Sequence, residues 1–262
     1  MIDTHCHLDV AAIALDRDDV LARAVAAAVQ GILVPATRIR PRAVGSTAAL
    51  ASPLVRIACG VHPQLVPELA PAERALDPEP LAALARAAGA VAIGECGLDG
   101  ATAERDLQEH LFRVQIRAAR LAKLPLVVHV LRAHDAAPAI LRDELAREVG
   151  GVLHSYSGGA DLVATYAHLG FAFSFAGPVT YANARRPVEA ARAVPAELLL
   201  AETDAPDQAP ASHRGARCEP AYLADVIAGL AAARGAPAEE VAALTTANAL
   251  RVFRHWRPSS PT

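Results

Sequence analysis

The chain has 262 residues, of which 53% are hydrophobic and 20% are charged, and its formal net charge is −3. A chain of this length can bury one large core, and a single α/β barrel of about 250 residues would use nearly all of it. The slightly negative charge excludes a protein that coats duplex nucleic acid through a broad basic surface, but it allows an enzyme with a local phosphate pocket.

Short apolar runs, which are typical of buried strands, recur along the chain. We predict eight strands, at residues 1–5, 31–35, 55–60, 90–94, 125–129, 151–154, 170–175 and 197–202. Helical periodicity predicts helices at residues 16–29, 80–88, 104–123, 135–148 and 161–169, and after the last strand at 219–234, 238–247 and 248–255. Eight strands that alternate with helices predict an α/β fold whose parallel sheet closes into a (β/α)8 TIM barrel.

Residues 1–256 are expected to form this barrel as one domain, because no Gly/Ser-rich or charged linker divides them. Residues 257–262 are rich in Pro and Ser and are expected to be a frayed tail. We find no signal peptide and no charge-free apolar stretch long enough to cross a membrane. We therefore expect a cytoplasmic protein that has no membrane contact and no obligate protein partner.

Potential metal ligands follow the predicted strands, at the ends where barrel enzymes carry their active sites. His5 and His7 stand two residues apart at the end of the first strand, so both rings can face one ion. Five histidines and two acids occupy such positions: His5, His7, His62, Glu95, His129, His154 and Asp204. Carboxylates that follow apolar strands need cations nearby, because an unpaired buried charge is costly. The remaining histidines, among them His134, are expected to face solvent.

Six motifs occur in order at these strand ends. They are Asp3-Thr4-His5-Cys6-His7-Leu8, Gly60-Val61-His62-Pro63, Ala92-Ile93-Gly94-Glu95-Cys96-Gly97-Leu98-Asp99, Leu124-Pro125-Leu126-Val127-Val128-His129, His154-Ser155-Tyr156-Ser157-Gly158 and Glu202-Thr203-Asp204-Ala205-Pro206. Together they resemble the TatD family of metal-dependent deoxyribonucleases, within the amidohydrolase-like barrel superfamily. The resemblance covers nearly the whole chain.

The resemblance implies a site with two divalent ions, such as Mg, Mn or Zn. His5, His7 and Asp204 would hold the first ion, His129 and His154 the second, and Glu95 would bridge them. Asp204 would also accept a proton from the attacking water, so Asp204 and Glu95 are the expected catalytic residues. The implied reaction is phosphodiester cleavage at the ends of single-stranded DNA, as a 3'-5' exonuclease that uses a metal-activated water.

Substrate contacts are expected from His62, Arg214 and Tyr156. His62 is expected to face the substrate or brace a loop rather than to bind metal, and Glu202 is expected to orient a ligand or a water. Other arginines on the same face, Arg185, Arg186 and Arg217, suit phosphate contact, but solvated surface residues are the more common explanation for any one of them. Two positions depart from the family pattern: Gly100 stands where an aromatic is usual, and Cys218 stands where Asn is common.

Two other functions remain open at this stage. The same ligands could serve a metal-dependent hydrolase of an ester or amide bond, for example in D-aminoacyl-tRNA deacylation, since fold alone does not separate these activities. A non-enzymatic protein that keeps a structural metal is disfavoured, because such a role does not require an open binuclear site.

Overall fold

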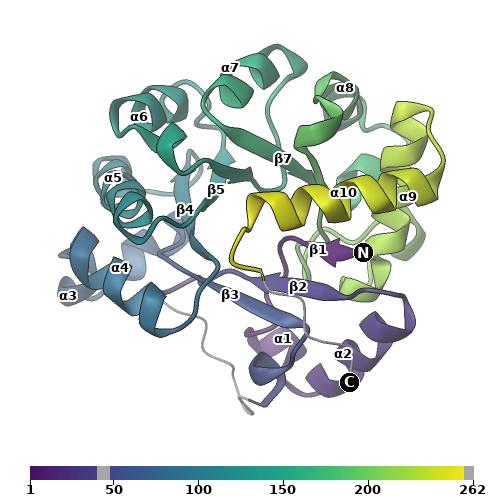
Figure 1. Cartoon of the computed structure of the whole chain (residues 1–262), viewed down its shortest axis with the longest axis horizontal. Helices are drawn as coiled ribbons and strands as arrows, with labels where there is room; N and C mark the ends of the chain where they lie inside the picture. The colour runs from purple at the N-terminus through teal and green to yellow at the C-terminus, as the bar shows by residue number, and fades with distance from the viewer. Residues whose placement is uncertain (40–47, 257–262) are drawn as a thin grey trace.

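A computed structural model of the chain describes residues 1–39 and 48–256 (Figure 1). The tail expected at residues 257–262 lies outside the described residues. Eight parallel strands form one sheet in the order of the sequence. They are β1 (Ile2–Asp3), β2 (Gly31–Val34), β3 (Val55–Cys59), β4 (Ala92–Asp99), β5 (Leu126–Leu131), β6 (Gly151–Leu153), β7 (Phe171–Phe175) and β8 (Leu199–Ala201). The predicted (β/α)8 barrel is confirmed.

Backbone hydrogen bonds join the two ends of the sheet. The Thr4 amide donates to the carbonyl of Ala201 at 3.3 Å, and the Asp204 amide donates to the carbonyl of His5 at 2.9 Å. The residues that follow β1 and β8 are therefore held side by side, although about 200 positions separate them in the chain.

Helices surround the sheet (Figure 1). They are α1 (Ala11–Ala14), α2 (Arg17–Ala26), α3 (Pro71–Arg74), α4 (Pro78–Ala87), α5 (Arg105–Ala122), α6 (Ala137–Asp143), α7 (Val163–His168), α8 (Arg185–Ala193), α9 (Leu223–Arg234) and α10 (Ala238–Val252). The sequence did not predict α8, a short helix in which only two alanines, Ala190 and Ala191, are fully buried. Among the described residues, no helix is long and apolar enough to span a membrane.

Two predicted boundaries were wrong for physical reasons. The predicted strand at residues 90–94 stopped before Glu95, whereas β4 continues through this buried carboxylate to Asp99. The predicted break at residue 248 does not exist, because α10 runs through Asn248. The Asn248 amide group donates to the carbonyls of Ala196 and Leu199 at 2.8 and 2.9 Å, so this polar residue anchors the helix to β8 instead of ending it.

The C-terminal segment covers one end of the barrel. Phe253 and Trp256, just after α10, pack in a buried cluster with residues of the strands that include Ile2, Leu33 and Leu200. In Figure 1, α10 lies across the front of the sheet. The amino ends of the strands are thereby closed with apolar side chains, and the carboxyl ends remain for polar chemistry.

Candidate metal centre

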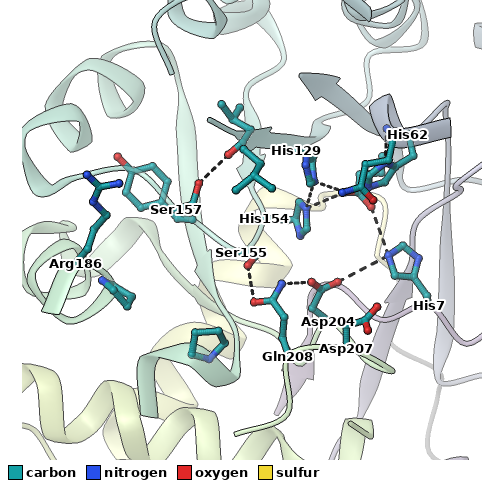
Figure 2. Close-up of a pocket in the computed structure, with 17 residues that line it drawn as sticks. His7, His62, His129, His154, Ser155, Ser157, Arg186, Asp204, Asp207 and Gln208 are labelled. Atoms are coloured by element: carbon teal, nitrogen blue, oxygen red, sulfur yellow. Dashed lines mark hydrogen bonds and ion pairs between the residues drawn. The ribbon is translucent and has the colours of Figure 1, made fainter. Parts of the chain in front are cut away.

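The structure brings the six predicted metal ligands together at the carboxyl ends of the strands. Glu95 lies at their centre, fully buried, and imidazole rings approach both of its carboxylate oxygens. Figure 2 shows His7, His129, His154 and Asp204 around the same cavity. Side chains from five different strand ends therefore meet at one carboxylate.

One group of ligand atoms surrounds Oε2 of Glu95. Nε2 of His5 lies 3.0 Å from this oxygen and Nε2 of His7 lies 3.5 Å from it. The two Nε2 atoms are 3.2 Å apart, and Oδ1 of Asp204 lies 3.6 and 3.8 Å from them. Two ligands of one tetrahedral zinc ion, each about 2.1 Å from it, are about 3.4 Å apart. This spacing fits a shared cation.

A second group surrounds Oε1 of Glu95. Nδ1 of His129 lies 3.1 Å from it and Nε2 of His154 lies 2.8 Å from it, and these two nitrogens are 3.0 Å apart. The two oxygens of one carboxylate thus face separate sets of ring nitrogens, which is the arrangement expected of a bridging ligand.

A hydrogen bond on the far side of the His129 ring indicates which of its nitrogens is free to bind a cation. Nε2 of His129 is hydrogen-bonded to Oδ2 of Asp99 at 3.1 Å, so a proton shared with this carboxylate leaves a lone pair on the nitrogen that points to Glu95. Nδ1 of His154 lies 3.3 Å from Oε1 of Glu202 but makes no hydrogen bond with any described residue. The role of Glu202 in orienting a ligand stays a prediction, and the contact from Asp99 was not foreseen.

His62 also reaches the cluster, but it turns a protonated nitrogen toward Glu95. Its Nδ1 accepts a hydrogen bond from the amide of Gln64 at 3.0 Å, so its proton is on Nε2, which lies 2.8 Å from Oε1 of Glu95. A protonated nitrogen donates to a carboxylate and does not bind a cation. His62 therefore donates to Glu95 at the edge of the cavity, and its separation from the predicted ligands stays a prediction.

The buried carboxylates and imidazoles of the site have a charge balance that favours a bound cation. Burial alone would raise the pKa of Glu95, but the rings of His154 and His62 hold it well below its usual range. Burial likewise raises the pKa of Asp204, to about 6, and lowers that of His7 to about 3. Within the described residues, Oε2 of Glu95 is buried yet makes no hydrogen bond. An uncompensated carboxylate oxygen in a dry interior is costly, so the donor set fits divalent cations.

Neighbouring residues place these side chains through the backbone. The Asp3 carboxylate accepts from the amides of His5 and Thr203 at 3.2 and 3.0 Å, which fixes the end of β1 against the residues after β8. Gly97 has φ +135°, and a Cβ on it would lie 2.0 Å from the carbonyl oxygen of His129. The glycine lets β4 approach β5 closely enough for His129 to reach Glu95.

Two buried glutamines of α5 hold loops of the site. Oε1 of Gln115 accepts from the amide of Val61, next to His62, at 2.7 Å. Oε1 of Gln108 accepts from the amide of Asp99 at 2.8 Å. Sequence reasoning missed both, because a glutamine in an amphipathic helix gives no signal of the loop that it will contact.

A cavity of about 560 Å³ opens from the cluster. His62 and Tyr156, two predicted substrate contacts, line it, whereas Arg214 is not among its described lining residues. The guanidinium of Arg214 lies 4.9 Å from the ring centre of Tyr181 instead. Tyr156 is a buried wall residue whose hydroxyl donates to the carbonyl of Gly159 at 2.9 Å. The substrate roles of these three residues stay predictions.

The remaining arginines and His134 have different environments. Arg186 lines the cavity and Arg185 does not, whereas Arg217 pairs with Asp16 and Glu219, each at 2.7 Å. The expectation that His134 faces solvent was wrong: the residue is half-buried, and its ring nitrogens lie 2.8 Å from the hydroxyl of Tyr166 and 3.2 Å from that of Ser157.

Comparisons with known proteins agree with this geometry. The sequence profile of a family described as TatD related DNase matches residues 2–254. The chain belongs to this family. It is 37% identical over 262 residues to YcfH of Escherichia coli (strain K12), an uncharacterized metal-dependent hydrolase, which covers 97% of the chain and 95% of the relative. It is 33% identical over 264 residues to the 3'-5' ssDNA/RNA exonuclease TatD of Salmonella typhimurium, which covers 97% of the chain and 98% of the relative.

A solved structure supports the same assignment. The crystal structure of YjjV, a TatD homolog from Escherichia coli K12, matches with a TM-score of 0.86 at 30% identity, over 97% of this chain and 98% of that one. The protein is therefore a TatD-family metal-dependent hydrolase.

The two departures from the TatD pattern lie outside the described cavity lining. A Cβ at Gly100 would lie 2.3 Å from the carbonyl oxygen of Arg132, so the ends of β4 and β5 pack too closely for a side chain there. Cys218 is buried, and its thiol donates to the carbonyl of Thr203 at 3.6 Å. Both residues pack against the backbone of this TatD-family barrel and not against its cavity.

Proposed function

We propose that this TatD-family hydrolase removes nucleotides from the ends of single-stranded DNA as a 3'-5' exonuclease. It would use two divalent ions, held by His5, His7, Glu95, His129, His154 and Asp204. The observation that carries the proposal is the position of Glu95, whose two oxygens face separate groups of ring nitrogens at 2.8–3.5 Å. When bound, such ions polarise a phosphoryl group and lower the pKa of a water.

The protein's own side chains supply the remaining parts of the reaction. Asp204 lines the cavity, so its carboxylate is placed to accept a proton from the attacking water. The amide group of Gln208 donates to Oδ2 of Asp204, which fixes the carboxylate plane. His62 donates to Glu95 and so keeps that carboxylate ionised and oriented.

Cleavage at a chain end agrees with the shape and charge of the molecule. The cavity is bounded at about 560 Å³, and the chain carries a net charge of −3, so the charge gives no sign of a long basic groove. The Salmonella relative is named as an exonuclease of ssDNA and RNA. A short single-stranded end is the substrate that these features fit.

The test is an assay of metal-stripped protein on single-stranded DNA labelled at its 5' end, before and after addition of Mg, Mn or Zn. We expect no cleavage before metal addition and stepwise shortening from the 3' end after it. Glu95→Gln should remove cleavage, and His168→Gln, a change on the exposed surface of α7, is the matched control. The nuclease proposal fails if no ion restores cleavage while an aminoacyl ester or an amide is turned over.

A further inference from the structure

The cavity has two chemically different ends. The metal centre forms one end, and Arg186, in the first turn of α8, lies at the other, across the cavity from His129 and His154 in Figure 2. Among the described residues that line the cavity, Arg186 is the one arginine or lysine. Its guanidinium makes no ion pair with any described residue, so its charge is available to a ligand.

Polar groups near Arg186 are occupied by other partners. Tyr156 and His134 are close enough to Arg186 for their pKa values to respond to its charge. The Tyr156 hydroxyl donates to the carbonyl of Gly159, and the Ser157 hydroxyl donates to the carbonyl of Val130 at 2.9 Å. Asp161 also acts on Tyr156 and His134, but it does not line the cavity. Asp207, the other acid at the rim, lies beside Asp204 in Figure 2.

Part of the cavity wall is apolar. Val130 and Leu131 from β5 line the cavity, together with Pro178 and Pro187. Such a surface suits the face of a base or a sugar but offers no contact for a charge. A ligand that fills the whole cavity would therefore carry a phosphate at the metal centre, a flat organic part in the middle and a second anion at Arg186.

We propose that Arg186 binds the phosphate next to the scissile one in a single-stranded substrate, so that the cavity recognises two successive phosphates. This inference rests on the proposed phosphodiesterase function. A guanidinium suits this role, because its fork of donors matches two phosphate oxygens at once. Arg186 would then favour oligonucleotides over compounds with a single phosphate.

The test compares three substrates: a trinucleotide, the same trinucleotide with an uncharged methylphosphonate at the linkage next to the scissile one, and bis(4-nitrophenyl) phosphate. For Arg186→Gln we expect KM on the trinucleotide to rise about tenfold more than on bis(4-nitrophenyl) phosphate, which corresponds to one lost charged contact. On the methylphosphonate, wild type and variant should be equal. Arg185→Gln, a neighbouring change that removes the same charge outside the cavity lining, should behave like wild type.

Binding of a fluorescent trinucleotide to metal-stripped protein, followed by anisotropy, gives a readout that needs no turnover. Equal weakening by Arg186→Gln and Arg185→Gln would overturn the inference, as would an Arg186 effect of the same size on the methylphosphonate. A wild type that hydrolyses none of the substrates would refute the proposed function. The anisotropy difference between the two variants would still decide whether Arg186 contacts the second phosphate.

Discussion

Replacing Gly97 by alanine tests how closely β4 must approach β5. The added methyl would lie 2.0 Å from the carbonyl oxygen of His129, whereas ordinary contact begins at 3.4 Å, so the strands must separate. The positive φ of +135° adds backbone strain. Strain and overpacking each cost about 1–3 kcal/mol, so we expect the free energy of unfolding to fall by about 2–6 kcal/mol. A displacement of about 1 Å at His129 should lower activity about 100-fold.

The measurements are urea unfolding followed by circular dichroism, metal content by mass spectrometry, and activity. Gly89→Ala is the matched control, because Gly89 also has a positive φ, of +65°, but no atom lies within 4 Å of its added Cβ. The control should lose only about 1–2 kcal/mol and keep its activity. If Gly97→Ala matches the control in both stability and metal content, close approach of the strands does not position the site.

Four further outcomes are expected. Glu95→Gln should lower the metal content below the two ions per chain of the proposed site, and a variant that binds as many ions as the wild type would contradict bridging. Asp99→Asn should weaken metal binding about 10–100-fold in calorimetry, because His129 loses its carboxylate partner. Unchanged affinity would show that the contact between Asp99 and His129 does not contribute to metal binding. Burial raises the pKa of Asp204 to about 6, so metal affinity should be steady above that pH and should fall below it as the carboxyl takes up a proton. Metal titrations at pH 5 and pH 7.5 measure this change in affinity. Asp204→Asn, which lacks the carboxyl group that takes up the proton, serves as the comparison variant. Asn248→Ala should lower the free energy of unfolding by about 2 kcal/mol, because two buried carbonyls lose their donor, and thermal melting would show whether it does.

The strands were predictable because a buried parallel strand leaves a short apolar run in any context. The end of β4 was not predictable, since a charged residue after an apolar run normally indicates that the strand has ended. Glu95 remains inside the sheet, where ring nitrogens of five histidines lie within 3.5 Å of its oxygens. Those rings come from the ends of different strands, so their approach to Glu95 is visible only in three dimensions.

In the candidate site, too, some features could be predicted from the sequence and others could not. Histidines at strand ends converge because the ends of a barrel's strands converge, so their proximity could be predicted from their order. The hydrogen-bond partners of these rings could not be predicted from the sequence. Asp99 meets His129 only because of the register of β4 against β5, in which Gly97 lies opposite His129. Nothing in the sequence distinguishes Arg214, which lies over Tyr181, from Arg186, which lines the cavity.

The seam between β1 and β8 has a consequence for synthesis of the protein. His5 and His7 leave the ribosome about 200 residues before Asp204 and before Ala201, whose carbonyl accepts from the Thr4 amide. A nascent chain that ends before β8 therefore lacks Asp204 among the proposed ligands of the first ion, and it lacks the strand against which β1 closes the barrel. The proposed site can therefore form only after β8 and Asp204 have been synthesised.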